Sequence, residues 1–339
     1  MSVQIGFIGV GGIARTHLET VSNSDDAAVA AVYDVDVDAV HSAADRWGAT
    51  PVTDLDELVS LPDLDAAFVC IPPDAHGPAE RAVAEHGLHL FVEKPVALRT
   101  EEAIAIHEDL ESADILTQVG HHWRYAPGIE HARVVLDNRT VGYLDGRWWG
   151  GVPGGPDHWW RTEARSGGQV IEQAIHIYDA LRYLVGEVES VCAAGGNRLV
   201  DAIDFPDVSS ATLKHENGTV SHVSASSAAV ESRIGIEVIA EDTTLSISES
   251  QVSGTIDGDP VDSRYDEDAY VREVEAFIEA VRRESPDPIR SPYGDGLRSL
   301  AVTEAVTKSM RREAPVAIEA VLDYDVSSNR YSVPVSEDS

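Results

Sequence analysis

The sequence predicts an α/β protein of two domains: a doubly wound parallel sheet, then an α+β domain with an open antiparallel sheet. A chain of 339 residues is too long for one ordinary hydrophobic core. Continuous apolar strand segments alternate with helical patterns as far as residue 121, which is typical of a parallel sheet covered on both faces. Alternating strand segments follow, as in an antiparallel sheet. We therefore expect domains at 1–121 and 122–325 and a polar tail at 326–339.

The first domain is expected to contain regularly alternating strands and helices. Apolar, β-branched runs predict strands, and 3.6-residue periodicity predicts helices. The predicted strands are 3–9, 27–34, 64–72, 88–94 and 114–120, and the predicted helices are 12–23, 37–48, 74–86 and 100–113.

The second domain is expected to be mainly antiparallel, with turn signals such as Asn217-Gly218 between its strands. The predicted strand segments are 141–153, 188–200, 207–227, 233–250 and 251–258. An apolar helix is predicted within 166–187, ending at Gly186, and further helices at 267–284 and 294–311. We expect the last helix to pack back on the first domain.

The first strand–helix turn carries a dinucleotide-binding pattern. "GFIGVGGIA" follows a predicted strand and opens a helix, and it has the G-x-G-x-x-G/A spacing. This arrangement brings backbone N–H groups and a helix N-terminus to a pyrophosphate. The residues of this turn assigned to cofactor binding are Gly9, Gly11, Gly12, Ile13 and Ala14.

Asp34 ends the second strand, at the position of a ribose-binding acid. A carboxylate accepts both ribose hydroxyls and repels a 2′-phosphate, so we expect NAD rather than NADP.

Three further strand ends carry polar side chains, and ligands of doubly wound sheets bind beyond the carboxyl ends of the strands. "CIPPDAH" presents Pro72 and His76, and "FVEKPV" presents Glu93 and Lys94. We assign these four residues to the cofactor site. "GHHWRYAP" (120–127) follows the last strand of the first domain.

These motifs, with "SGGQVIEQAIHIYDALRYLVGE" (166–187), resemble the Gfo/Idh/MocA family of sugar and cyclitol oxidoreductases along nearly the whole chain. The resemblance implies a Rossmann domain and a second domain whose sheet face forms a dimer or tetramer interface. It implies that Lys94 reaches the reacting hydroxyl, that Pro95 is a cis-proline, and that His176 is the catalytic base. An ammonium can stabilise a developing alkoxide, and an imidazole can take the hydroxyl proton.

Glu172 departs from the family pattern, which has aspartate in D-x-x-x-H. In one continuous helix Glu172 and His176 lie a turn apart on the same face, so we expect Glu172 to orient His176. Asp179 is expected to anchor the imidazole or the helix. A zinc site that includes His121 and His122 is the alternative, but no zinc-binding motif is present and we predict no metal.

A Gly/Pro-rich segment, 148–168, precedes this helix and holds four of the six tryptophans. Its aromatic side chains are expected to stack on a sugar or to pack beneath the loop. Arginines nearby either recognise an anionic substrate group or pair with acids. The residues assigned to substrate binding are Lys94, His122, Arg124, Trp160, Arg161, Glu172 and His176.

The composition of the chain indicates its environment and limits the classes of molecule that it can bind. The net charge of −34 and the presence of only three lysines indicate adaptation to high salt, which screens self-repulsion. They argue against nucleic-acid binding, which needs a basic surface. Two cysteines, no signal peptide and no apolar run of membrane-spanning length predict a cytoplasmic protein without disulfides or membrane segments.

The predicted function is NAD-dependent oxidation of a secondary alcohol of a sugar, sugar derivative or cyclitol, in a homodimer or homotetramer. Two alternatives stay open. Relatives of this architecture include NAD-dependent glycosidases, and a sensor that binds dinucleotide and sugar without turnover would explain the departure at Glu172.

Overall fold

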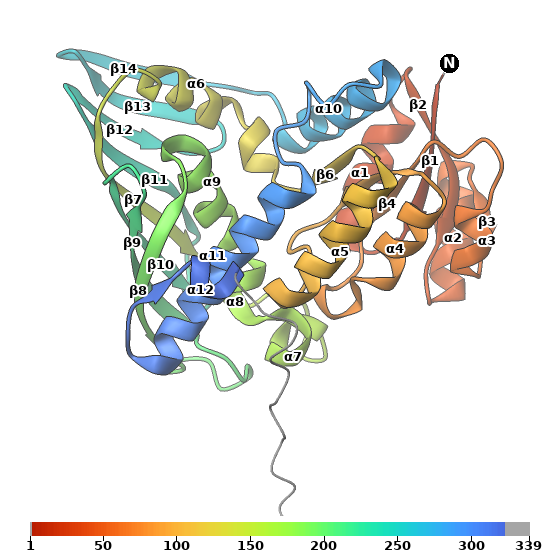
Figure 1. The fold of residues 1–339 in the computed structure, drawn as a ribbon, viewed down its shortest axis with the longest axis horizontal. Helices are drawn as coiled ribbons and strands as arrows, with labels where there is room; N and C mark the ends of the chain where they lie inside the picture. The colour runs from red at the N-terminus through yellow and green to blue at the C-terminus, as the bar shows by residue number, and fades with distance from the viewer. Residues whose placement is uncertain (1, 323–339) are drawn as a thin grey trace, which may run out of the picture.

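The computed structural model describes residues 2–322, so the predicted tail at 326–339 lies outside the described residues. Figure 1 shows two sheets side by side, with helices between them. This arrangement confirms the predicted fold class: a parallel sheet with helices on both faces, followed by a second sheet domain.

The first sheet is entirely parallel and has the strand order β3-β2-β1-β4-β5-β6. Its strands are rich in Val, Ile, Phe and Ala because helices cover both faces. They are β1 (Val3–Ile8), β2 (Ala27–Tyr33), β3 (Thr50–Val52), β4 (Ala66–Val69), β5 (His89–Val92) and β6 (Thr117–Val119). The connecting helices are α1 (Gly12–Ser22), α2 (Val37–Trp47), α3 (Leu55–Val59), η1 (Pro73–Ala75), α4 (Pro78–Glu85) and α5 (Thr100–Ala113). The short elements β3 and α3 carry too few residues to show a periodicity, and the sequence did not predict them.

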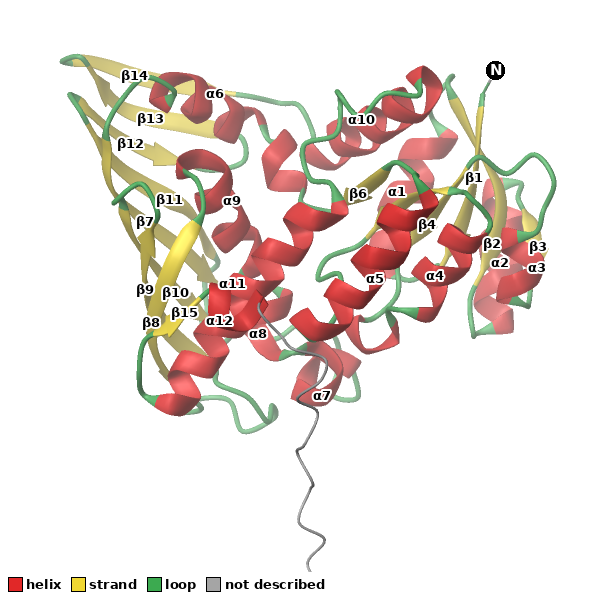
Figure 2. Cartoon of the chain, in the orientation of Figure 1, coloured by secondary structure: helices red, strands yellow, loops and turns green. Residues whose placement is uncertain are grey.

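The second sheet has nine strands in the order β14-β13-β12-β11-β7-β10-β9-β8-β15. They are β7 (Val141–Trp149), β8 (Val188–Gly196), β9 (Val208–His215), β10 (Val220–Ser226), β11 (Arg233–Ala240), β12 (Thr243–Ile247), β13 (Gln251–Ile256), β14 (Asp259–Arg264) and β15 (Val316–Ala317). Helices cover one face, and in Figure 2 the other face carries no helix of the described residues.

The second sheet is mainly antiparallel, as expected, and its one parallel pair among the described residues joins β7 and β10. The long segment from residue 150 to 187, with its helices, carries the chain away from β7 before the sheet resumes at β8. That crossover allows the parallel pairing, which a two-residue hairpin does not.

Helices fill the space between the two sheets. They are η2 (His122–Tyr125), α6 (Pro127–Leu136), η3 (Trp159–Arg161), α7 (Glu163–Ser166), α8 (Gly168–Glu172), α9 (Ile175–Val185), α10 (Ala269–Arg283), α11 (Tyr293–Arg312) and α12 (Glu319–Leu322). Helix α10 packs Val274 and Phe277 against the first sheet. Helix α11 packs Leu297 and Leu300 against the first domain and its later residues against the second sheet. No helix of the described residues is long and apolar enough to cross a membrane.

The predicted single helix within 166–187 is two helices. Residues 173–174 form a turn between α8 and α9, in which Ala174 N donates to the carbonyl of Gln169 and Ile177 N to that of Ala174. These two hydrogen bonds span five and three residues instead of the four of an α-helix. Glu172 and His176 therefore belong to different helices.

Candidate functional site

A cavity of about 630 Å³ lies at the carboxyl ends of the parallel strands and reaches toward the second sheet. It is the size of a small-molecule site. Its lining comes from both domains: Gly9, Gly11, Gly12, Ile13, Tyr33, Asp34, Val35, Cys70, Ile71, Pro72, Pro73, Ala75, Glu93, Lys94, His122, Trp148, His158, Trp159, Arg165, Glu172, Gln173, His176 and Tyr270.

The glycine turn after β1 forms one end of this cavity. Gly9 has φ +92°, and a Cβ there would lie 2.4 Å from the carbonyl oxygen of Cys70. A Cβ on Gly11 or Gly12 would meet nothing within 4 Å, so ligand can approach the backbone there. Helix α1 begins at Gly12 without a side-chain cap, which leaves its first N–H groups available to an anion.

Asp34 lies beside this turn, at the end of β2. Its Oδ2 accepts a hydrogen bond from the Val10 N–H at 2.9 Å, and its Oδ1 accepts one from the Asp36 N–H at 3.0 Å. Each carboxylate oxygen has a second lone pair, so Asp34 can still accept from ribose hydroxyls. The uncapped helix, the open glycines and this fixed carboxylate together fit a dinucleotide.

Lys94 reaches the cavity from the end of β5, and the Lys94–Pro95 peptide bond is cis as expected. The Lys94 ammonium donates to the Glu172 carboxylate at 2.7 Å and to the Glu172 carbonyl at 2.8 Å. An ammonium has three donors, so one remains for a substrate hydroxyl.

Glu172 is therefore the partner of Lys94, and the expectation that it orients His176 was wrong. Its second carboxylate oxygen accepts from the Trp160 indole N–H and from the Gln173 amide. No hydrogen bond among the described residues joins Glu172 to His176. The turn at 173–174 separates the two side chains, and the nearby ammonium attracts the carboxylate.

His176 lies in the cavity wall and is only 4% exposed. Trp148 stacks on its ring with the centroids 5.2 Å apart. Burial first, and then the positive charge of Lys94, hold the pKa of His176 well below 6.5. The imidazole is thus neutral at neutral pH and can accept a proton.

Glu93, the residue before Lys94, also lines the cavity. Its carboxylate contacts the buried His17 ring at 2.7 Å and accepts from the Lys94 N–H at 3.1 Å. Burial alone would raise its pKa, but the hydrogen bond from His17 and the positive charges of His17 and Lys94 together lower the pKa. A Cβ on Gly120 would lie 2.9 Å from this carboxylate, so only glycine leaves it room.

Two profiles of one family match this chain. The GFO/IDH/MocA profile described as an oxidoreductase family with an NAD-binding Rossmann fold matches residues 3–121. The GFO/IDH/MocA C-terminal domain matches residues 140–246. The chain belongs to the GFO/IDH/MocA oxidoreductase family.

Relatives of this oxidoreductase match along almost its full length. Myo-inositol 2-dehydrogenase of Thermotoga maritima is 26% identical over 94% of this chain and 100% of the relative. Inositol 2-dehydrogenase of Rhizobium meliloti is 28% identical over the same shares. A crystal structure from Sinorhizobium meliloti 1021, assigned to a myo-inositol dehydrogenase, has a TM-score of 0.81 at 26% identity and covers 94% of this chain and 100% of that one.

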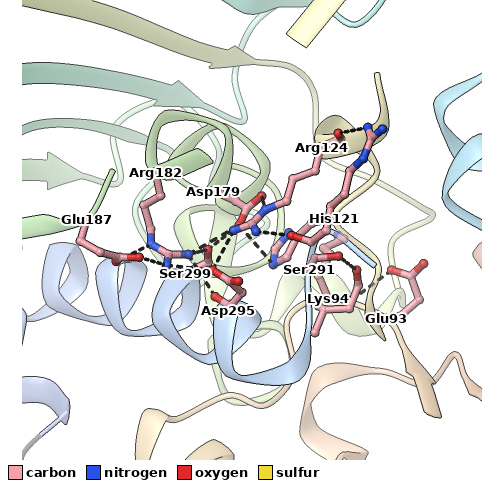
Figure 3. A network of polar contacts seen from close by, with 12 residues as sticks. Glu93, Lys94, His121, Arg124, Asp179, Arg182, Glu187, Ser291, Asp295 and Ser299 are labelled. Atoms are coloured by element: carbon pink, nitrogen blue, oxygen red, sulfur yellow. Dashed lines mark hydrogen bonds and ion pairs between the residues drawn. The ribbon is translucent and has the colours of Figure 1, made fainter. Parts of the chain in front are cut away.

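Arg124 does not line the site of this oxidoreductase, contrary to expectation. It is buried in an ion network where it binds both oxygens of Asp179, at 2.9 and 2.8 Å, and Figure 3 shows this pair beside Arg182 and Asp295. Burial opposes the charge of Asp179, but Arg124, together with His121 and Arg182, lowers the carboxyl pKa. Asp179 therefore anchors Arg124, with its nearest imidazole, His121, 3.8 Å away.

Four more expected site residues do not line the cavity. Trp160 is 1% exposed and packs on Phe205 while it supports Glu172. Arg161 donates to the Gly155 carbonyl. His76 is buried against Glu80, and Ala14 is on the side of α1 that is buried in the core.

The cavity also contains residues that the sequence analysis did not assign. They are Tyr33, Val35, Cys70, Ile71, Pro73, Ala75, Trp148, His158, Trp159, Arg165, Gln173 and Tyr270. Pro73 and Ala75 follow the "CIPP" motif and Val35 follows Asp34, so the strand-end rule could have included them. Tyr270 lies on an amphipathic helix, α10, and carries no sequence signal. No group of three or more His, Cys, Asp or Glu side chains in residues 2–322 could hold a metal ion.

Proposed function

We propose that this oxidoreductase is an NAD-dependent dehydrogenase that oxidises a secondary alcohol of an uncharged sugar or cyclitol. The observation that carries the proposal is one cavity holding both the nucleotide-type turn and the pair Lys94 and His176. The inositol dehydrogenases among its relatives support the substrate class.

The proposed mechanism divides the work between three side chains. The third N–H of Lys94 binds the reacting hydroxyl and stabilises its developing negative charge. Neutral His176 takes the hydroxyl proton. Glu172 fixes the position of Lys94. NAD, when bound, supplies the hydride acceptor.

Asp34 supports NAD over NADP, because its carboxylate would repel a 2′-phosphate. The substrate is proposed to be uncharged because the Lys and Arg side chains of the cavity are already paired with carboxylates. Lys94 is paired with Glu172, and Arg165 is paired with Asp74 at 2.8 Å. Neither Arg124 nor Arg161 faces the cavity to bind an anionic group.

The test measures NADH formation from inositols, aldoses and sugar acids in molar salt. Lys94→Ala and His176→Ala should each lower kcat by about 10²-fold or more, since each removes one charge-stabilising or proton-transfer group. Turnover in both variants at the wild-type rate would contradict the mechanism. A tenfold preference for NADPH would contradict the role of Asp34.

Two outcomes would favour the alternatives. Release of an aglycone without net NADH would indicate a glycosidase, and tight NAD binding without turnover would indicate a sensor.

We also propose that the chain forms a homodimer or homotetramer through the uncovered face of the nine-stranded sheet, in a salty cytoplasm. Tyr143, Val220 and Ile239 are exposed apolar side chains at neighbouring, paired positions of this sheet. Ile239→Glu should produce monomers in light scattering if this face is the interface.

A further inference from the structure

The proton that His176 takes needs a route away from the cavity. His176 is 4% exposed, and bound substrate would cover its open side. Its Nδ1 is buried and has no hydrogen-bond partner among the described residues. A proton released from that nitrogen must therefore pass through the protein.

His122 lies beside His176 in the wall of the cavity. The two rings meet edge to face with their centroids 4.7 Å apart. The Nδ1 of His122 is also buried without a partner in residues 2–322. Tyr270 stacks on the other side of His122 with the centroids 4.0 Å apart, which fixes the ring between α9 and α10.

Glu249 continues this line toward solvent. It lies in the turn between β12 and β13, with its carboxylate 3.6 Å from Nε2 of His122 and its side chain 42% exposed. A small rotation of this side chain or one bridging water completes a hydrogen bond.

The turn that carries Glu249 borders a second cavity, of about 550 Å³, on the outer side of Tyr270. Tyr270 lines both cavities, so the Tyr270–His122 pair separates the catalytic cavity from this outer one. The outer cavity is also lined by Asp266, Glu267 and Asp268, whose negative charges favour an arriving proton.

The other histidine near His176 offers a poorer route. The ring of His121 is 6.4 Å from that of His176, and it leads to Asp179. Asp179 is fully buried and both its oxygens bind Arg124, so a proton there has no exit.

We propose that His122 and Glu249 form a proton relay that carries the substrate proton from His176 to the outer cavity. The proposal rests on the dehydrogenase function proposed above. His176 accepts the proton at Nε2 and gives its Nδ1 proton to Nδ1 of His122. His122 gives its Nε2 proton to the Glu249 carboxylate, which releases it to water. Both rings end neutral, and proton exchange with water resets their tautomers when product leaves.

The charged and titratable groups around His122 come from five places in the fold. They are His176 of α9, Tyr270 of α10, Glu249 of the β12–β13 turn, Glu93 and Lys94 after β5, and the neighbouring His121. Tyr270 and Glu249 both contact His122 and line the outer cavity, and of these two it is Glu249 that brings a carboxylate to Nε2 of His122.

The test uses Glu249→Gln, which keeps the shape of the side chain and removes its proton acceptor. At low buffer concentration its kcat for polyol oxidation should fall about tenfold with KM unchanged, and added imidazole should restore kcat, because a small base can replace the relay. Glu249→Asp should retain most activity. Glu267→Gln is the matched control, since Glu267 lines the same cavity and pairs with Arg272 rather than His122.

A kcat of Glu249→Gln that equals the wild-type value, or that imidazole does not restore, would overturn the relay. An equal loss in Glu267→Gln would show that the charge of the cavity matters and would also overturn it. If the wild-type chain oxidises no polyol, the proposed function fails, and the relay is judged separately by NMR. Exchange of the His176 ring proton with solvent should then be slower in Glu249→Gln, and an unchanged exchange rate would overturn the relay.

Discussion

The Glu172 carboxylate binds three donors at once. One oxygen holds Lys94, and the other holds the indole of Trp160 and the amide of Gln173. The Glu172 carboxylate therefore couples Lys94 to the tryptophan segment of the second domain.

Two substitutions separate the effect of the negative charge of Glu172 from the effect of its side-chain length. Glu172→Gln keeps the reach but leaves the Lys94 ammonium without its anion, so kcat should fall about tenfold or more while the fold persists. Glu172→Asp keeps the charge but withdraws it from Trp160, so the free energy of unfolding should fall by about 1–3 kcal/mol. Steady-state kinetics and urea unfolding measure the two effects. Unchanged kcat in Glu172→Gln would contradict the role given to this carboxylate.

The lowered pKa of His176 predicts the pH dependence of the proposed oxidation. The proposed base must be deprotonated, and its pKa lies well below 6.5, first through burial and then through Lys94. Activity should therefore hold at neutral pH and be lost only as pH falls through that lowered value. NMR titration of His176 should show the pKa rise when Lys94→Gln removes the positive charge. A titration above pH 6.5 in the wild-type protein would refute this account.

The sequence allowed us to predict which side chains line the cavity where a backbone motif fixes their position. It did not where the contact partner comes from a distant part of the sequence. Lys94 and Asp34 follow strand ends, so topology alone brings both to the cavity. Trp159 and Trp160 are adjacent in a segment without periodicity, and Trp159 lines the cavity while Trp160 is buried beneath it. Arg124 was assigned to substrate because its acid partner, Asp179, lies 55 positions away in the sequence.

At the scale of elements, long periodic segments were predictable and interruptions were not. Helix α5 matches its predicted range of 100–113, and α11 matches 294–311 to within one residue at each end. The turn at 173–174 lies inside an uninterrupted apolar pattern, so the sequence gives no signal for it. At the break, a tertiary contact takes the place of a helical bond: Lys94 donates to the last carbonyl of α8.

Helix α10 carries a buried carboxyl that weakens the fold at neutral pH. Glu273 is fully buried, and neither of its oxygens has a hydrogen-bond partner in the described part of the chain. Burial first, and then the charge of Glu93, raise its pKa well above 4.5. The unfolded chain ionises near pH 4.5 and the folded chain resists ionisation, so stability is lost as pH rises from there toward the raised pKa.

Glu273→Gln should remove this penalty. The free energy of unfolding should increase by about 1–3 kcal/mol near pH 8 and be almost unchanged near pH 4, where the carboxyl is neutral in both states. Urea unfolding at the two pH values measures this. A loss of stability near pH 8 would show that Glu273 has a stabilising partner.

For the whole molecule, the net charge of −34 makes stability depend on salt. Repulsion between acids acts over the Debye length, which shrinks from about 10 Å at 0.1 M to about 3 Å at 1 M salt. We expect the Tm to rise by several degrees across this range of KCl. Sucrose serves as the uncharged control, and an equal rise in sucrose would show that screening is not the cause.

Helix α11 ties the two sheets into a single body. Its Glu304 accepts the Thr100 N–H of the first domain, its Tyr293 N–H donates to Thr117, and its Ser299 binds Arg182 of the second domain. A hinge motion between the domains would have to break these contacts. His158 and Trp159 of the 150–165 segment line the cavity. We therefore expect movement of that segment, rather than a closing of the domains, to admit the ligands and to limit how fast product is released.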